Sequence, residues 1–387
     1  MSEPLTSSSE FVAPLQQSPL HAEHVALGAA FTDFGGWQMP VRYGSDLVEH
    51  HAVRTAAGIF DISHMAEISV TGADAGAFLD YALAGRLSTL PLLKAKYSLL
   101  LDERGGIVDD LIVYASAEAE YLVVANASNR HAVVEALVAR QTDFEVQLSD
   151  LTEHLALIAV QGPVSRRVLE ATPGIELRDD LSRGRTLDSL GYYAAMGMAF
   201  DGTSVLVART GYTGEDGFEL YVDAEQAVAL WRALLAAGEP LGLVPCGLAA
   251  RDTLRLEAGM PLYGHELGRS IQPSQAGLGR VVVADKSRFV GKSAIEAGPA
   301  PDARVLVGLT TEGRRAPRAD YLVMNGDAEV GVITSGALSP TLGHPIAMAF
   351  VDPAVREPGT ALEVDVRGTR VAATVVPLPF YDRKAAS

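Results

Sequence analysis

The sequence has little cysteine, fewer basic than acidic residues, and no long apolar runs. Its one cysteine, Cys246, excludes an intramolecular disulfide and a cysteine-based metal cluster. The formal net charge of −17 argues against nucleic acid or an anionic membrane surface as a partner, because phosphate binding needs a basic surface. The longest apolar runs fall short of the ~20 residues that a membrane span requires. We therefore expect a cytoplasmic protein that makes no contact with membranes.

The N-terminal segment, residues 1–18, is rich in serine and has neither a basic start nor a sustained apolar core. It matches no signal or transit peptide, and we expect it to be a disordered extension. The remaining chain has ordinary globular composition, since the whole sequence is 48% hydrophobic and 20% charged. Its length of 387 residues is sufficient for two or three domains.

Strand-like and helix-like patterns alternate up to residue 298, which favours an α/β or α+β body. Helices are predicted at 46–55 and 248–257 from apolar spacing and, for the second, a glycine stop at Gly259. A linker follows at 299–302, and beyond it come six short β runs. Hairpin turns at Asn325-Gly326 and Arg367-Gly368 separate some of these runs, so we expect a small C-terminal β-barrel over residues 303–387.

Two adjacent carboxylates, Asp109 and Asp110, interrupt an otherwise apolar strand that follows a turn at 102–106. Neighbours on a strand point to opposite faces, so the two acids lie in different surroundings. A carboxylate among buried side chains is costly without a partner, which makes at least one of them a functional candidate. The alternative, that one caps the loop and the other faces water, is equally open from spacing alone.

Two further stretches have an unusual pattern: a glycine-rich segment followed by a charged residue inside a strand, and a helix with two arginines on one face. Residues 210–217 hold three glycines at every third position, but no helix follows and the spacing is not that of a nicotinamide-binding motif. Glu219 comes next, inside an apolar strand, where it either has a function or faces solvent. Arg251 and Arg255 share one helix face with apolar residues, which favours buried acids or an oxygen-rich ligand as their partners.

A metal site is not expected. The most suggestive group is Glu49-His50-His51. Consecutive helical residues point about 100° apart, so they cannot bind one ion together.

Several segments, taken together and in order, resemble the T-protein of the glycine cleavage system, the aminomethyltransferase family. The resemblance runs from about residue 19 to residue 383 and is carried by these motifs: Asp61-Ile-Ser-His-Met65, Gly105–Tyr114, Thr210–Glu219, Ala250–Gly259, Ser335–Gly343 and Pro379-Phe-Tyr381. It implies an α+β, three-domain, cloverleaf-like fold whose body, residues 19–298, consists of two interleaved α/β subdomains. The family's folate site is a central cavity.

The resemblance also implies a reaction in glycine catabolism and one-carbon metabolism. The donor partner would be lipoylated H-protein carrying an aminomethyl group. The acceptor would be tetrahydrofolate, and the products 5,10-methylenetetrahydrofolate, ammonia and dihydrolipoyl H-protein. Neither a metal nor a flavin is expected.

Carried over position by position, the resemblance implies that Asp110 is the catalytic acid, while Arg255 is a structural ion-pair partner. A carboxylate there can hold the folate amine, accept its hydrogen bond and offset developing positive charge. The positions that it implies for folate binding are Glu219, Arg251, Tyr97, Met65, Asn126, Tyr212 and Tyr381.

Two other classes of protein share features with this sequence. A non-enzymatic folate-binding protein of iron–sulfur cluster maintenance would carry a lysine-glycine-cysteine-tyrosine signature, whereas the one cysteine lies in Pro245-Cys246-Gly247. Another folate-dependent enzyme, such as a demethylase or the folate domain of an oxidase, would share the fold. The absence of a flavin-domain pattern counts against the oxidase, and intact Asp110 counts only weakly against a demethylase. A purely structural protein would leave these charges as scattered surface groups.

Overall fold

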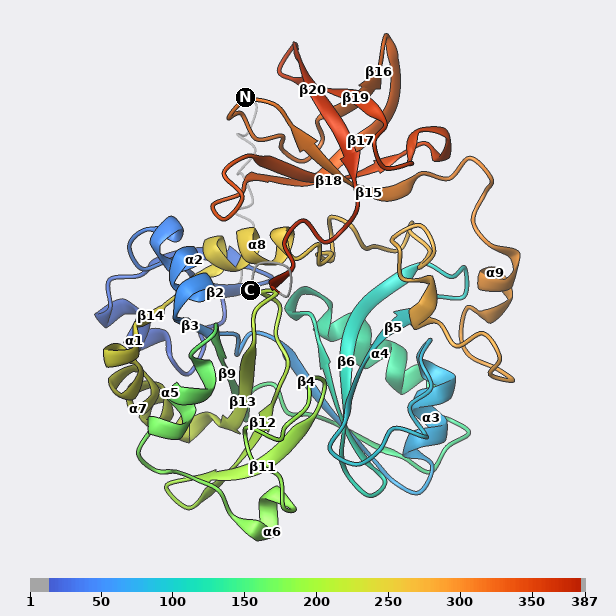
Figure 1. Cartoon of the computed structure of the whole chain (residues 1–387). Coiled ribbons are helices and arrows are strands. Elements are labelled where there is room, and N and C mark those ends of the chain that lie inside the picture. Colours follow the sequence, from blue (N-terminus) through green and yellow to red (C-terminus); the bar gives the residue numbers. More distant parts are fainter. Residues whose placement is uncertain (1–13, 384–387) are drawn as a thin grey trace, which may run out of the picture.

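The protein, a computed structural model of which describes residues 14–383, is built around two large open sheets and a closed barrel, with a small two-stranded sheet beside them. The barrel is stacked above the two sheets (Figure 1). The expected α+β fold with a C-terminal β-barrel is therefore confirmed. In the described part of the chain, no helix is both long and apolar enough to cross a membrane.

The first sheet has seven strands, in the order β10-β11-β12-β13-β9-β3-β14. Its strands are β3 (Ala57–Asp61), β9 (Leu155–Gln161), β10 (Ile175–Glu176), β11 (Ala195–Phe200), β12 (Thr203–Ala208), β13 (Gly217–Asp223) and β14 (Leu243–Pro245). Helices α5 (Ser165–Ala171) and α7 (Ala227–Gly238) cover one face, while the short α6 (Asp179–Ser182) packs near β11. Trp231 of α7 is fully buried in that core because its apolar stripe faces the sheet.

The second sheet has five strands, in the order β5-β6-β7-β4-β8. Its strands are β4 (Ala66–Thr71), β5 (Ala95–Leu101), β6 (Ile107–Ala117), β7 (Glu120–Ala125) and β8 (Gln147–Asp150). Helices α3 (Ala75–Ala82) and α4 (Arg130–Arg140) cover one face. Segments before and after this sheet belong to the first one, so the two units are interleaved in the chain.

The two sheets repeat one folding unit. The run β4-α3-β5-β6-β7-α4 recurs as β9-α5-β11-β12-β13-α7, with β10 and α6 inserted before β11. The four matching strands are arranged in the same order in both sheets. At matching places, Gly72 and Gly162 have φ values of 129° and 131°, and a Cβ would lie 2.2 Å and 2.5 Å from a carbonyl oxygen. The sequence shows no fixed-period repeat. A strand needs only an alternation of apolar and polar residues, so the two copies of the unit can form without having the same residues at matching positions.

The faces that the helices leave open pack against each other. Tyr114 of β6 and Val124 of β7 lie in one apolar cluster with Leu157 of β9 and Tyr221 of β13. Burying this area is favourable by about 25 cal/mol per Å² of apolar surface. The packing also brings β6 and β13 face to face, which places the carboxylates of both strands in the same interior.

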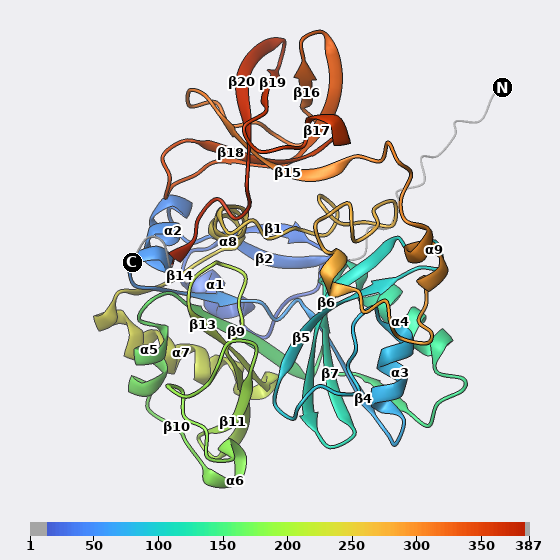
Figure 2. The ribbon, with the colours of Figure 1, turned by 45° about the vertical axis from the view of Figure 1, so that its right-hand side comes forward.

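The N-terminal part of the described chain is folded into the body. It forms α1 (His21–Ala26), β1 (Ala30–Phe34), β2 (Trp37–Arg42) and α2 (Asp46–Thr55), and the β1–β2 hairpin passes between the barrel and the sheets (Figure 2). Ser18 is 5% exposed and donates to the buried Asp61. The expected disordered extension, residues 1–18, is thus folded by residue 18, and residues 1–13 of it lie outside the described residues.

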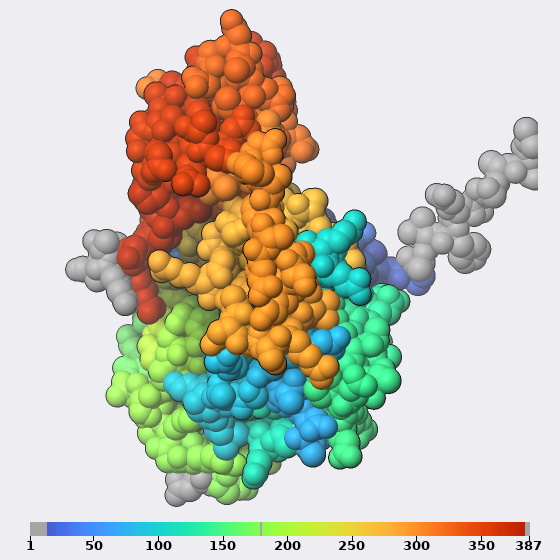
Figure 3. Space-filling model, turned by 90° about the vertical axis from the view of Figure 1, so that its right-hand side faces the viewer, coloured from blue at the N-terminus to red at the C-terminus, as the bar shows by residue number. Residues whose placement is uncertain are grey.

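The segment between α8 (Leu248–Glu257) and the barrel has little regular structure apart from α9 (Lys292–Ala297). Much of it appears in orange in Figure 3, where it lies over the blue and cyan part of the chain that contains α3 and β5. Lys286 fastens it there, because its ammonium donates to the carbonyl oxygens of Asp80, Leu83 and Gly85 at 2.5–2.7 Å. These acceptors lie at the C-terminal end of α3, where a positive charge is favoured.

The barrel closes in the order β15-β18-β17-β16-β19-β20. Its strands are β15 (Val305–Thr311), β16 (Leu322–Asn325), β17 (Ala328–Leu338), β18 (Pro345–Val351), β19 (Ala361–Val366) and β20 (Thr369–Val376). Both predicted hairpins are present, at 325–328 and 366–369. The predicted helices at 46–55 and 248–257 match α2 and α8.

Glu257, at the end of α8, joins the barrel to the body. Its buried carboxylate accepts hydrogen bonds from Arg54 Nη2 at 2.7 Å, Ser339 Oγ at 2.5 Å and Thr341 N at 3.0 Å. Donors and positive charge around the carboxylate, with His50 contributing most, lower the pKa of Glu257 to about 2 against the opposing effect of burial.

Glu257→Gln should lower the free energy of unfolding at neutral pH by about 3 kcal/mol, the usual cost of breaking a buried ion pair. The ionised Glu257 stabilises the fold above its ordinary pKa of 4.5, and this contribution is lost as the pH falls toward 2. The difference between variant and wild type, measured by denaturant unfolding, should therefore shrink below pH 4.5. Glu225→Gln, at an exposed position, is the control. A pH-independent difference would contradict this explanation.

Candidate functional site

Asp110 lies on the face of β6 that points toward the first sheet. Its Oδ2 accepts a hydrogen bond from the Tyr97 hydroxyl on β5 at 3.0 Å, and its Oδ1 accepts one from Asn126 Nδ2 at 2.9 Å. Asn126 comes directly after β7, so three neighbouring strands hold this one carboxyl group. All three side chains are half-buried, which leaves them partly accessible to water.

Asp109 points to the opposite face and is fully buried. It accepts from Asn126 N at 3.0 Å, Asn126 Nδ2 at 2.8 Å and Asn129 Nδ2 at 2.6 Å. Burial and the neighbouring charge of Asp110 raise the pKa of Asp109 to about 7. Burial also raises the pKa of Asp110, although the donors Tyr97 and Asn126 oppose the rise. The pair therefore resists losing both protons near neutral pH.

Glu219 lies on β13 and is 7% exposed, so it does not face solvent. Its Oε2 accepts a hydrogen bond from the Thr210 hydroxyl at 2.5 Å. Burial raises the pKa of Glu219, while Thr210 and the charge of Arg251 act in the opposite direction. Glu219 is therefore a carboxyl group held in the interior between the two sheets.

Arg251 extends from α8 toward the same region, where its guanidinium lies 5.0 Å from the centre of the Tyr212 ring. Its Nη1 is buried and has no hydrogen-bond partner among the described residues. An unpaired buried donor is costly, and an acceptor group of a bound ligand would remove that cost. Burial and the charge of Arg251 together lower the pKa of His64 to about 4. Arg255, by contrast, forms the expected ion pairs, with Asp252 and Glu266.

The glycine-rich loop before β13 packs against the buried side chain of Gln161. Its amide donates to the Thr210 carbonyl oxygen and accepts from the Thr213 hydroxyl, both at 3.1 Å. A Cβ on Gly211 would lie 2.1 Å from Gln161, and one on Gly217 would lie 2.5 Å away. A side chain at either position would displace the Gln161 amide, which holds the loop through the Thr210 carbonyl oxygen.

The structure brings most of the predicted site residues together. Tyr97, Asp110 and Asn126 share hydrogen bonds. Burial and, to a smaller extent, the charge of Asp110 raise the pKa of Tyr212. Tyr212 in turn contacts Arg251. Met65 is half-buried against the apolar cluster between the two sheets.

Tyr381 is not part of this group. Its hydroxyl donates to Glu215 Oε1 at 2.8 Å, and the Arg54 guanidinium lies 4.1 Å from its ring centre. These contacts belong to the junction between the body, the loop and the C-terminal segment. Its link to the site is indirect, through the loop that carries Tyr212.

Sequence reasoning missed Asn129, Thr210 and Tyr114. Asn129 supports Asp109, and Thr210 supports Glu219. A signal was available for Tyr114, which lies four residues after Asp110 on the same strand and hence on the same face. No sequence pattern marks the partners of Asn129 and Thr210, because they come from other elements.

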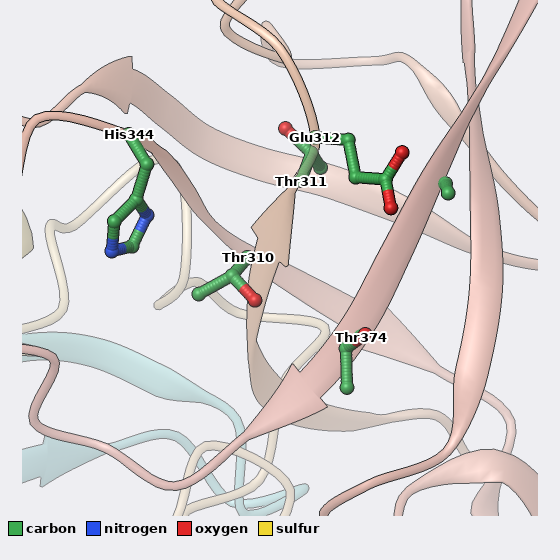
Figure 4. A pocket seen from close by; sticks show the side chains of 6 residues that line it. Thr310, Thr311, Glu312, His344 and Thr374 are labelled. Carbon is green, nitrogen blue, oxygen red and sulfur yellow. The ribbon is translucent and has the colours of Figure 1, made fainter.

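Two surface pockets lie on the barrel, and neither is lined by a predicted site residue. One, of about 270 Å³, is bordered by Thr310 and Thr374 on adjacent strands, with His344 to one side (Figure 4). The other, of about 420 Å³, is bordered by the exposed Arg315, Arg318 and Arg367. Neither pocket contains a buried carboxyl group comparable to Asp110 or Glu219.

Comparison with known protein families covers most of the chain. Residues 20–286 match the model described as the GCVT N-terminal domain. Residues 304–382 match the glycine cleavage T-protein C-terminal barrel domain.

Individual relatives give the same result along their whole length. The chain is 57% identical over 370 residues to an aminomethyltransferase of Cutibacterium acnes, covering 95% of this chain and 99% of the relative. It is 52% identical to one of Streptomyces coelicolor, covering 96% and 98%. The crystal structure of the glycine cleavage system aminomethyltransferase T from Bartonella henselae superposes with a TM-score of 0.86 at 37% identity, covering 95% and 98%.

The Asp109–Asp110 pair predicts an unusual carboxyl titration. In ¹³C NMR of the protein with labelled aspartate, one side-chain signal should titrate with a midpoint near pH 7. Asp110→Asn removes the neighbouring charge and should lower that midpoint, whereas Asn129→Ala removes a donor to the ionised form and should raise it. Asp143→Asn, at an exposed position, should leave it unchanged. The interpretation fails if every aspartate titrates below ~5, within the ordinary range.

Proposed function

Since the chain belongs to the glycine cleavage T-protein family, we propose that its site passes a one-carbon unit from aminomethyl-lipoyl H-protein to tetrahydrofolate. The protein is thus an aminomethyltransferase of the glycine cleavage system. The methylene carbon forms bonds to N5 and N10 of the folate, while its bonds to the lipoyl sulfur and the amino nitrogen break. The two protons lost from the folate nitrogens balance ammonia and the free thiol.

Asp110 is the group that we assign to the reacting folate nitrogen. The supporting observation is its double anchorage, because Tyr97 and Asn126 hold one oxygen each while the carboxyl group stays half-buried. A carboxylate fixed in this way can orient the attacking amine and accept its proton. Its negative charge also stabilises the positive charge that develops at the methylene carbon. Asp109 is assigned to the scaffold, where it holds Asn126.

Glu219 and Arg251 are the polar groups that we assign to folate binding. A carboxylate can accept the adjacent N–H donors of the pterin ring, and a guanidinium can donate to its oxygen or to a carboxylate. The unpartnered Nη1 of Arg251 supports this role, since a ligand acceptor would satisfy it. We place Met65 and Tyr212 at the apolar wall of the site, with Tyr97 and Asn126 beside the reacting end.

Tyr381 is assigned to holding the glycine-rich loop, because its contacts are with Glu215 and Arg54. The family-model ranges and the start of β15 support a division into a body at 19–298 and a barrel at 303–387. Tetrahydrofolate acts as a substrate in this proposal, and lipoylated H-protein is the donor partner.

The deciding experiment mixes the protein with tetrahydrofolate and aminomethylated H-protein and measures ammonia. Ammonia should appear only when both substrates are present. If release does not exceed that of a folate-free control, the proposed reaction is wrong.

Asp110→Asn should slow folate-dependent ammonia release by ~100-fold or more, the usual contribution of a positioned acid–base group. Binding of tetrahydrofolate, measured by titration calorimetry, should persist because the amide keeps the shape of the side chain. The comparison is Asp109→Asn, whose effect on turnover should be smaller. A severe Asp109→Asn with a mild Asp110→Asn would reverse the assignment.

Arg251→Gln should weaken tetrahydrofolate binding by about tenfold, as expected for loss of a charge-assisted hydrogen bond. The change should appear mainly in KM rather than in kcat, because the guanidinium is assigned to binding. Arg314→Gln, at an exposed barrel position, is the matched control. Unchanged folate affinity in Arg251→Gln would exclude Arg251 from the folate site.

A further inference from the structure

We infer that Tyr114 is a positioning residue that orients Glu219 for the ligand through the Thr210 hydroxyl. Tyr114 lies on β6, four residues beyond Asp110 and on the same face of the strand. The inference rests on the proposed function and adds a specific role for a residue outside the groups assigned above. The strand β6 would then position both carboxyl groups of the site. It carries Asp110 itself, and through Tyr114 it orients Glu219, which lies on β13 across the interface between the two sheets.

The observation behind it is a continuous chain of hydroxyl groups. The Tyr221 hydroxyl donates to the Tyr114 oxygen at 3.2 Å, and the Tyr114 and Thr210 oxygens are 3.0 Å apart. The Thr210 hydroxyl reaches Glu219 Oε2 at 2.5 Å. All four residues are buried, and the rings of Tyr114 and Tyr221 meet edge to face with centres 5.6 Å apart.

The number of hydroxyl protons sets the donor and the acceptor of each hydrogen bond in this series. Each hydroxyl has a single proton to donate. Thr210 uses its proton on Glu219, so the bond between Thr210 and Tyr114 must be donated by Tyr114. Tyr114 then accepts from Tyr221. Every link therefore points toward Glu219, whose Oε2 must be an unprotonated acceptor for the chain to hold.

This arrangement has a consequence for the ligand. Oε2 of Glu219 is occupied by Thr210, so the side chain is held in one orientation and its other oxygen is the one available to ligand N–H groups. Donation along the chain polarises each hydroxyl and strengthens the last bond to the carboxylate. It opposes the effect of burial, which by itself favours the neutral acid. Tyr114 acts on Glu219 only through Thr210, and that restriction can be tested.

The test measures the tetrahydrofolate dissociation constant and the kinetics of ammonia release in the full-length enzyme. Thr210→Val keeps the shape but removes the hydroxyl, and it should weaken folate binding by about tenfold. Tyr114→Phe keeps the buried ring and should weaken binding by about threefold. For both variants KM should rise more than kcat falls. Thr210→Ser restores a hydroxyl and should bind nearly as well as wild type.

A double-mutant cycle separates positioning from general structural support. If Tyr114 acts through Thr210, Tyr114→Phe should cause almost no further loss in the Thr210→Val background. Tyr121→Phe is the control, since Tyr121 is a buried tyrosine on β7 that packs on the helix-covered face of the same sheet. Its folate affinity should match wild type.

Two results would overturn the inference: wild-type folate affinity in Tyr114→Phe, or fully additive losses in the double variant. Melting temperatures show whether any loss reflects unfolding, and Thr210→Ser preserves the comparison if Tyr114→Phe folds poorly. Failure of the proposed function is distinguishable, because wild-type protein would then release no folate-dependent ammonia.

Discussion

The burial of carboxyl groups between two packed sheets is the constraint on which the site depends. The open faces of both sheets pack through Tyr114, Val124, Leu157 and Tyr221, which excludes water from most of the interface. A carboxylate there is unfavourable unless donors surround it. Asp110 and Glu219 have such donors in this interface, and Asp109 has its own donors on the opposite face of β6. In each case the donors come from neighbouring strands or loops rather than from the same element. The packing of the sheets and the hydrogen bonds to these buried carboxyl groups therefore specify the site together.

A buried charge also connects the C-terminal barrel to the body of the molecule. Glu257 accepts hydrogen bonds from the body through Arg54 and from the barrel through Ser339 and Thr341. The same arginine contacts the glycine-rich loop at the Thr213 carbonyl oxygen, 2.7 Å away, and lies over Tyr381. The position of the loop that carries Tyr212 is thus linked to the docking of the barrel, although the barrel supplies none of the carboxyl groups.

Local sequence patterns predicted the individual helices and hairpins of this protein but not the arrangement that depends on distant residues. Helices at 46–55 and 248–257 were predictable because apolar spacing and end signals act within the segment itself, and the barrel hairpins were predictable from their turn residues. Composition did not reveal that Ser18, at the end of the predicted extension, hydrogen-bonds to Asp61 in the folded body. The repeat of one folding unit in the two sheets was also invisible, because strand pairing depends on alternation and not on particular residues.

For the site, the sequence by itself determined which residues were out of place: acids in apolar strands, arginines on an apolar helix face, and glycines at close spacing. The ordered motifs determined the family. Only the tertiary structure decided that Asp109 is enclosed by Asn126 and Asn129 while Asp110 stays accessible. It also decided that Thr210 hydrogen-bonds to Glu219 and that Tyr114 hydrogen-bonds to Thr210. The physical reason is that a hydrogen-bond partner is selected by proximity in space. Asp109 and Asn129, 20 positions apart, become partners only after the second sheet has formed, and Tyr114 and Thr210, 96 positions apart, only after the two sheets have packed.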